Sequence, residues 1–169
     1  MKEIIAPQTL AIPFFAGGFL ILKLTALKEN DMKVKFDEIK SNVSTNPGIY
    51  EIYTNDGVAL KVGIAENLKK RLTQHANSRQ KSLKFSIETE NAMPSDVESK
   101  QSILAKHLYF DSSISPEYNL TSEIGRQSFL KECCYLIVTE TETRDRARQI
   151  ERLKEASGKY RYVGRVIKR

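Results

Sequence analysis

Two neighbouring stretches near the middle of the chain have the residue pattern of strands. Residues 48–54 are rich in β-branched and aromatic side chains. In residues 58–64 every second residue, from Val58 to Ile64, is apolar, which places these side chains on one face. The Asn-Asp-Gly sequence at 55–57 is a signal for a tight turn. The pattern therefore predicts a β-hairpin.

Three further segments are predicted to be helical. The first begins near residue 67, has an apolar stripe, and ends by residue 77 or 78. The second covers 96–108 and follows a Ser-x-x-Glu sequence at 95–98, which has the form of a capping box. The third runs over 144–156 and stops at a Ser-Gly pair.

The other apolar segments predict additional strands. Residues 83–87 alternate apolar and polar side chains and would add a third strand to the hairpin. Residues 133–138 form a continuous apolar run suited to a strand covered on both faces. Residues 160–167 are predicted to form a short edge strand, and 111–125 a loop. The predicted fold class is α/β (α+β): a small antiparallel sheet of about three strands flanked by helices, with a C-terminal strand and helix extension.

The chain divides into three parts by composition. Residues 1–31 are an apolar extension in which 4–22 carry no charge, which is long enough to span a bilayer. This run contains prolines and a glycine pair, and the segment before it lacks the basic character of a secretory signal. It is interpreted as translation from a start codon upstream of Met32, as a membrane anchor, or as a segment packed on the domain; membrane attachment is not favoured. The main domain covers 32–120, and 121–169 is an extension packed on it.

Charge is unevenly distributed along the chain, whose formal net charge is +6. Residues 61–84 carry seven basic residues and one acidic residue, and 144–169 carry ten basic and three acidic residues. Between them, 85–143 carry four basic and ten acidic residues. This distribution suggests a surface that binds a polyanion, with nucleic acid as the leading candidate. The alternative is two solvated helix faces whose charges pair with the acidic middle segment.

Cysteine and histidine usage limits the metal chemistry and the compartment. Cys133 and Cys134 are adjacent, so in a strand they point to opposite faces and a disulfide between them is not expected. A reducing, cytoplasmic setting fits this usage best. The chain has two histidines and no Cys-x-x-Cys sequence, which argues against a structural zinc site. His107 is interpreted as a surface or packing histidine, and a metal held by carboxylates stays open.

A set of residues in fixed order crosses the predicted hairpin and the helix that follows it. Gly-Ile-Tyr occupies 48–50, and Lys-Val-Gly occupies 61–63. Arg71 and His75 then follow on the helix. This combination resembles the signature of the GIY-YIG nuclease family, and the resemblance covers roughly residues 46–120.

The resemblance implies a Mg²⁺-dependent DNA endonuclease with a Glu on a later helix as metal ligand. Glu98 takes that place and would hold one Mg²⁺ ion, for which Mn²⁺ substitutes. Asn119, in a Pro-x-Tyr-Asn sequence, takes the place of the supporting amide. Two positions depart from the family pattern: Lys61 stands where a tyrosine is usual, and the spacing from Glu98 to Asn119 is long. Glu151, on the last basic helix, is therefore the second candidate carboxylate.

The same residues suit phosphodiester hydrolysis on physical grounds. With a two-residue hairpin loop, Tyr50 and Lys61 share one face of the sheet, whereas a three-residue loop would separate them. On one face, the Lys61 ammonium would favour the Tyr50 phenolate as the general base. Arg71 and His75 are neighbours on the helix; Arg71 can bind a phosphate through two donors, and His75 can orient Tyr50 or bind a phosphate. Glu98 would hold Mg²⁺ at the leaving group.

Basic side chains around this site are expected to contact the phosphates of double-stranded DNA. They are Lys69, Lys70, Arg79, Lys81, Arg148 and Arg152. A small chain of this kind suits a restriction-type or repair-type nuclease, and a homodimer is compatible with it. The alternative function is a catalytically inactive nucleic-acid-binding module with the same fold. A membrane-tethered interaction protein built around the N-terminal run is a third interpretation.

Overall fold

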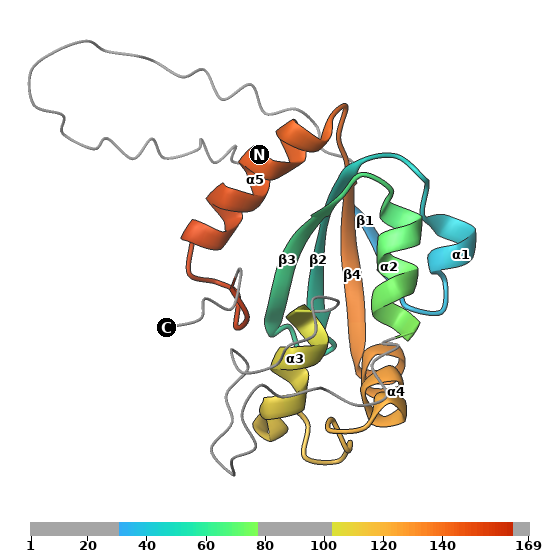
Figure 1. Cartoon of the computed structure of the whole chain (residues 1–169), viewed down its shortest axis with the longest axis vertical. Coiled ribbons are helices and arrows are strands. Elements are labelled where there is room, and N and C mark those ends of the chain that lie inside the picture. The colour runs from blue at the N-terminus through green and yellow to red at the C-terminus, as the bar shows by residue number, and fades with distance from the viewer. Residues whose placement is uncertain (1–30, 78–102, 164–169) are drawn as a thin grey trace, which may run out of the picture.

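The computed structural model describes residues 31–77 and 103–163 of the chain (Figure 1). Predictions that concern residues 83–87 and 95–98 lie outside these ranges. The elements, in chain order, are β1 (Met32–Lys35), α1 (Ile39–Asn42), β2 (Gly48–Thr54), β3 (Ala59–Ala65), α2 (Leu68–Asn77), α3 (Ile103–Phe110), the 3₁₀ helix η2 (Ser112–Ile114), α4 (Glu123–Cys133), β4 (Cys134–Glu140) and α5 (Arg144–Ala156).

The four strands form one antiparallel sheet in the order β1-β4-β2-β3. The predicted α+β class with a small antiparallel sheet flanked by helices is confirmed. β4 lies between β1 and β2, so residues after 120 supply a central strand of this sheet. β3 is at an edge, as is β1.

Three residues form the loop of the β2–β3 hairpin. The backbone N–H of Thr54 donates to the carbonyl of Val58 at 3.0 Å, which leaves residues 55–57 as the loop. Gly57 has a φ of +92°, which a side chain would disfavour. A loop of this length would by itself place Tyr50 and Lys61 on opposite faces.

A β-bulge restores the expected arrangement. Tyr53 pairs with Ala59, but the register shifts by one residue between Tyr53 and Ile52, which pairs with Lys61. Beyond the shift, Tyr50 pairs with Gly63. Paired residues share a face, and so do residues two apart, which puts Tyr50 and Lys61 on the same face of the sheet.

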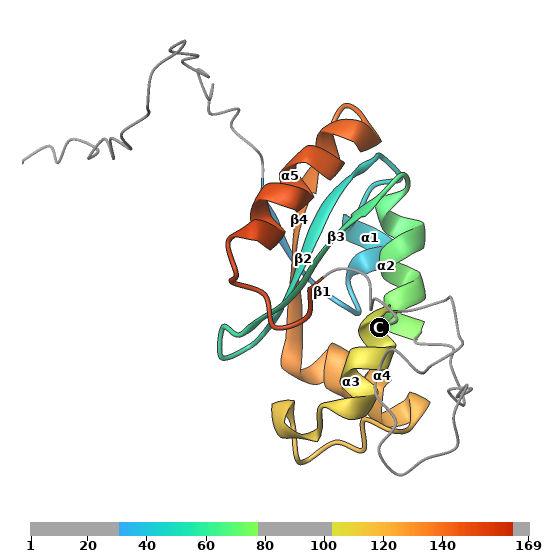
Figure 2. The ribbon, with the colours of Figure 1, turned by 60° about the vertical axis from the view of Figure 1, so that its left-hand side comes forward.

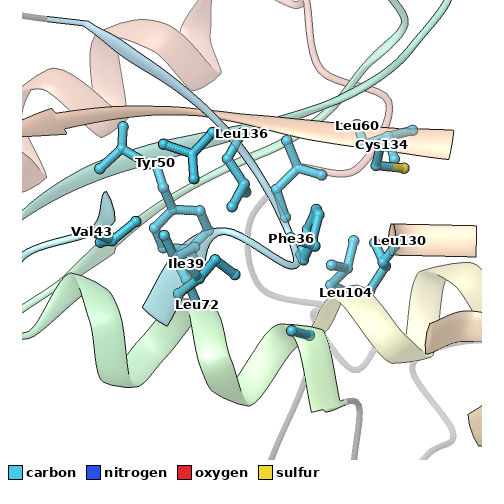
Figure 3. Close-up of a cluster of buried hydrophobic side chains, with 14 of the residues drawn as sticks. Phe36, Ile39, Val43, Tyr50, Leu60, Leu72, Leu104, Leu130, Cys134 and Leu136 are labelled. Carbon is cyan, nitrogen blue, oxygen red and sulfur yellow. The ribbon is translucent and has the colours of Figure 1, made fainter. Parts of the chain in front are cut away.

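Helices cover both faces of the sheet (Figures 1 and 2). The α1 and α2 side holds the larger apolar core, which includes Phe36, Ile39, Leu72 and Leu136 and extends to α3 and α4 (Figure 3). On the opposite face, α5 buries Ile150 against apolar side chains of β2 and β3. Because β2 is covered on both faces, all seven of its residues are buried.

The C-terminal elements follow the predictions up to residue 156. β4 and α5 confirm the predicted strand and helix, and α5 begins and ends at the predicted residues. A short edge strand was predicted over 160–167. Residues 160–163, the part of it that the structure describes, do not form a strand. The N–H groups of Arg161 and Tyr162 both donate to β3, whereas in a strand adjacent N–H groups point to opposite sides.

The predicted loop at 111–125 also contains structure. η2 lies within it, and α4 begins at Glu123. The Ser122 side chain accepts a hydrogen bond from the N–H of Gly125 at 2.9 Å and so caps α4. β1, α1 and α4 are elements that the residue pattern did not predict.

Two further predictions concern cysteines and membrane spans. Cys133 and Cys134 are free cysteines; Cys133 is the last residue of α4, whereas the prediction placed both in the strand, and Cys134 begins β4. Within the described ranges, no helix has the length and apolar character needed to cross a membrane. The uncharged run at 4–22 lies outside those ranges.

Candidate active site

Tyr50 lies on the α2 side of the sheet, at the centre of the candidate site. It is on β2, is only 1 % exposed, and points its ring toward α2 beside Ile39 and Leu72 (Figure 3). The ring passes over Gly63 on β3: a Cβ at that position would lie 2.6 Å from the Tyr50 Cζ. The glycine of the second tripeptide therefore provides the space that the Tyr50 ring occupies.

A hydrogen bond joins the Tyr50 hydroxyl to Nε2 of His75 at 2.8 Å. His75 is on α2, where it is buried together with Leu68 and Leu72. Burial, aided by the positive charges of Arg71 and Lys61, lowers the pKa of His75 to about 3. At neutral pH His75 is therefore an uncharged imidazole that holds the phenol in place.

Arg71 precedes His75 by one turn of α2 and acts on the Tyr50 phenol. Burial raises the pKa of Tyr50 above its usual value of 10.0, while the charge of Arg71 and its hydrogen bonding to the phenol oppose this rise. Arg71 is therefore a cation that favours the phenolate. The expectation that Lys61 also favours it stays a prediction. Lys61 lies on the face expected from the spacing, whereas the effect of Arg71 on the Tyr50 pKa was not expected from the sequence.

Lys61 is a buried lysine on the edge strand β3, with 6 % of its surface exposed. Burial lowers its pKa, the carboxylates of Glu155 and Glu151 oppose this, and Arg71 adds to it. Lys61 also contributes to the lowered pKa of His75. Lys61 therefore belongs to the same group of side chains as Tyr50, Arg71 and His75.

Glu151 brings a carboxylate to this group from α5. Thr143 caps the helix, and Ile150 anchors it on the sheet. Glu151 is half-buried, and burial and the charge of Glu155 raise its pKa. The charge of Glu151 acts in turn on the pKa of both Tyr50 and Lys61. The carboxylate proposed second from the sequence thus lies within electrostatic reach of the motif residues; Glu98, proposed first, is outside the described residues.

Glu155 is a second carboxylate on α5 that the sequence interpretation missed. It lies four residues after Glu151, so the two occupy one face of the helix. Its charge is the largest one that acts on the pKa of Lys61. The i, i+4 spacing of two glutamates was the available signal.

Asn119 lies elsewhere, in the turn between η2 and α4. It is exposed, and its Oδ1 accepts hydrogen bonds from the N–H and hydroxyl of Thr121 at 3.2 and 2.5 Å. Within the described ranges no hydrogen bond joins Asn119 to Tyr50, Arg71 or His75. The structure does not bring this residue together with the other motif residues.

Four of the basic residues expected to contact DNA are described, and none is buried. Lys69 and Lys70 are on α2, and Arg148 and Arg152 are on α5. Arg148 forms an ion pair with Asp145 at 3.6 Å. Figure 1 shows the two helices on opposite sides of the β2–β3 hairpin. Arg79 and Lys81 lie outside the described residues.

Two carboxylates of α5, those of Glu151 and Glu155, are the oxygen donors that act on the motif residues. In the described part of the chain, no cluster of three or more His, Cys, Asp or Glu side chains is arranged to hold a metal. Mg²⁺, however, commonly binds to one or two carboxylates and completes its shell with water and substrate phosphates. Glu151 and Glu155 supply two such carboxylates, and a cation beside them would relieve the repulsion that raises the pKa of Glu151. These two carboxylates are the candidate groups for a single Mg²⁺ ion.

His107 packs against the C-terminal segment. Its ring stacks on Tyr162 with 4.9 Å between centroids, and burial lowers its pKa. Among the described residues its buried Nε2 has no hydrogen-bond partner. This stacking agrees with the predicted packing role.

Comparison of the chain with protein-family models, with curated proteins and with solved structures finds no match. The resemblance to GIY-YIG nucleases accordingly rests on the order and spacing of the motif residues. The geometry around Tyr50 is the independent observation beside it: four motif positions, Tyr50, Lys61, Arg71 and His75, meet on one side of the sheet.

Proposed function

We propose that the chain is a Mg²⁺-dependent DNA endonuclease of the GIY-YIG type. The observation that carries this proposal is the 2.8 Å hydrogen bond between the Tyr50 hydroxyl and His75, with Arg71 acting on the same phenol. A phenol aligned by a neutral imidazole and favoured as phenolate by a guanidinium has the features of a general base. Lys61 and Glu151 add a cation and a carboxylate from two further elements.

Tyr50 takes a proton from the attacking water in this proposal. Tyr50 acts as the phenolate and becomes the neutral phenol when it takes this proton. His75 fixes the direction of the Tyr50 oxygen, and Arg71 compensates the negative charge of the phenolate before the transfer. Arg71 is only half-buried, so its outer N–H groups can also bind the scissile phosphate. Lys61 supplies a second positive charge toward the phosphate.

Glu151, supported by Glu155, would hold the Mg²⁺ ion. When bound, the ion supplies positive charge for the departing oxygen of the phosphodiester, and Mn²⁺ would substitute for it. Glu98 is the competing carboxylate. We favour Glu151 because its charge acts on Tyr50 and Lys61 within the described structure.

The proposed substrate is double-stranded DNA, held through its phosphates by the basic side chains of α2 and α5. Lys70, Arg148 and Arg152 are exposed there and require no rearrangement to contact a polyanion. A cytoplasmic restriction-type or repair-type role, and a homodimer that cuts a two-fold site, belong to the same proposal.

Incubation of the purified chain with supercoiled plasmid tests this function. Cleavage in Mg²⁺ that stops in EDTA and is absent from the Tyr50→Phe variant is expected. Tyr50→Phe keeps the ring over Gly63 and removes only the hydroxyl, so its folding should stay close to that of the wild type. Intact plasmid with the wild-type chain in Mg²⁺ and in Mn²⁺ would reject the proposal.

One observation favours the alternative function of an inactive nucleic-acid-binding module. Tyr50 is 1 % exposed and burial raises its pKa, so in the DNA-free protein the phenol is protonated and covered. DNA binding that weakens with salt, measured by fluorescence anisotropy, together with intact plasmid, would support that module.

A further inference from the structure

Glu51 is a buried carboxylate on β2, on the sheet face opposite to Tyr50. Only 4 % of the residue is exposed, yet its two oxygens accept three hydrogen bonds. Lys154 of α5 donates at 2.6 Å, Tyr53 donates at 2.6 Å, and the hydroxyl of Tyr160 donates to the same oxygen as Tyr53. These donors keep the pKa of Glu51 below its usual value despite its burial. The carboxylate is therefore ionised and fully partnered.

The contact with Lys154 fixes how α5 lies on the sheet. Ala147 and Ile150 are the buried side chains of α5, and apolar packing has little directional preference. The ion pair between Lys154 and Glu51 joins defined atoms and so sets the rotation and position of the helix. This ion pair joins α5 to the inner strand β2.

Helix geometry connects this contact to the candidate active site. Glu151 lies three residues before Lys154 on α5, and Glu155 lies one residue after it. Because the three residues belong to one helix, the place where Lys154 is held sets the positions of both glutamates. The Tyr50 hydroxyl reaches over Gly63 on the edge strand β3, and α5 packs against the same strand. Glu151 therefore acts on Tyr50 and Lys61 from across β3.

The segment after α5 strengthens the same arrangement. Tyr160 donates to Glu51, and the backbone N–H groups of Arg161 and Tyr162 donate to the carbonyls of Ala59 and Leu60 at 2.9 and 2.8 Å. The C-terminal end of α5 is thus bound to the strand that carries Lys61. Movement of α5 along the sheet would break these contacts.

We propose that Glu51 is a positioning residue: through Lys154 it holds α5 so that Glu151 lies beside Lys61 and Tyr50. The role of Glu51 in cleavage rests on the proposed nuclease function. The effect of Glu51 on the position of Glu151 is independent of that function.

The Lys61 pKa, followed by carbon NMR of the lysine Cε, reports the place of Glu151 without metal or DNA. The groups that act on it are Glu151 and Glu155 from α5 and Arg71 from α2, and Lys61 acts in turn on His107 of α3. Glu151→Gln removes one of the carboxylates that raise the Lys61 pKa, so this pKa should fall. The size of that fall is the reference with which the other variants are compared. Lys154→Met is expected to lower this pKa in the same direction because α5 is no longer held.

The direction of the shift separates positioning from a simple charge effect. Loss of the positive charge of Lys154 would by itself raise the Lys61 pKa, because one repelling cation is gone. Lys154→Arg keeps a cation that can donate to Glu51 and should restore the wild-type value. Lys131→Met, which removes an exposed lysine on α4, is the matched control and should leave the value unchanged.

Cleavage of plasmid DNA supplies the second readout. Lys154→Met should cut about tenfold more slowly or worse, as is usual when a residue that orients a ligand is lost, and Lys154→Arg should recover most of the rate. Tyr160→Phe, which removes a different donor to Glu51, should give a smaller effect in the same direction. A Lys61 pKa that is unchanged or raised in both Lys154→Met and Tyr160→Phe would overturn the positioning role. Absence of cleavage by the wild-type chain would reject the nuclease function, while the Lys61 pKa would still decide the position of Glu151.

Discussion

Burial keeps Tyr50 and His75 in their neutral forms at pH 7. The pKa of the phenol is raised and that of the imidazole is lowered to about 3, so neither side chain ionises easily without help. Arg71 is the nearby group that stabilises the phenolate. At the residue scale, the proposed chemistry therefore depends on Arg71 as much as on Tyr50.

The buried imidazole predicts a specific loss of stability in acid. His75 has a pKa of about 3 in the folded chain and 6.5 as its reference value, so between these values the unfolded state binds more protons. Protonation of His75 in the unfolded state should therefore lower the free energy of unfolding by about 1.4 kcal/mol per pH unit as the pH drops from 6.5 toward about 3. Urea unfolding at a series of pH values measures it. In His75→Gln, which can still bond to Tyr50, this part of the pH dependence should vanish; an unchanged dependence would contradict the assignment.

Arg71 predicts the pH profile of cleavage. Because the guanidinium holds the pKa of Tyr50 lower than burial alone would, Arg71→Met should raise that pKa and move the rising part of the pH–rate profile to higher pH. The rate at neutral pH should fall, since a higher Tyr50 pKa leaves a smaller fraction of the phenol ionised. Lys40→Met, which removes an exposed cation on α1, serves as the control. Profiles of Arg71→Met and wild type that coincide would remove the phenolate from the mechanism.

At the scale of elements, the β2–β3 hairpin has the arrangement of side chains expected from the sequence but reaches it through a different loop and a bulge. The parity of Tyr50 and Lys61 was predicted for a two-residue loop, but the loop has three residues and a bulge restores the parity. Asn-Asp-Gly signals a tight turn and does not determine its length, and the bulge leaves no signal in the residue pattern. Both loop lengths were open from the sequence; the loop has three residues, and the bulge keeps Tyr50 and Lys61 on one face.

Gly63 offers a test of the packing between these strands. Alanine is better suited than glycine to the interior of a strand, yet Gly63→Ala places a methyl group into the ring of Tyr50. We expect a loss of about 1–3 kcal/mol in the free energy of unfolding. The same substitution in a Tyr50→Leu background should cost less, because the ring is gone. Equal costs in both backgrounds, measured by urea unfolding, would contradict the close approach.

For the whole molecule, the central position of β4 is decisive. Residues after 120 were interpreted as an extension of a domain that covers 32–120, whereas β4 pairs with both β1 and β2 inside the sheet. A fragment of residues 32–120 would leave the inner edges of β1 and β2 without their partner strand. We expect it to be unfolded by circular dichroism, and a fragment of residues 32–163 to show the cooperative unfolding of the full chain. A cooperative transition in the shorter fragment would contradict the topology.

The same topology explains which site residues sequence reasoning found. Tyr50, Lys61, Arg71 and His75 lie within one hairpin and the next helix, so local spacing was enough to group them. Glu151 is about a hundred residues from Tyr50 in the sequence, and it reaches the site only because β4 pairs with β2 and α5 then returns over β3. That long-range pairing has no local signal, which is why Glu151 ranked second.

The most direct test of the account compares two carboxylate variants in Mg²⁺ on supercoiled plasmid. Glu151→Gln keeps the size of the side chain and removes its charge, and Glu98→Gln makes the same change at the competing position. We predict that Glu151→Gln abolishes cleavage while DNA binding and folding persist, and that Glu98→Gln cuts at the wild-type rate. Full activity in Glu151→Gln, with activity lost in Glu98→Gln, would contradict it.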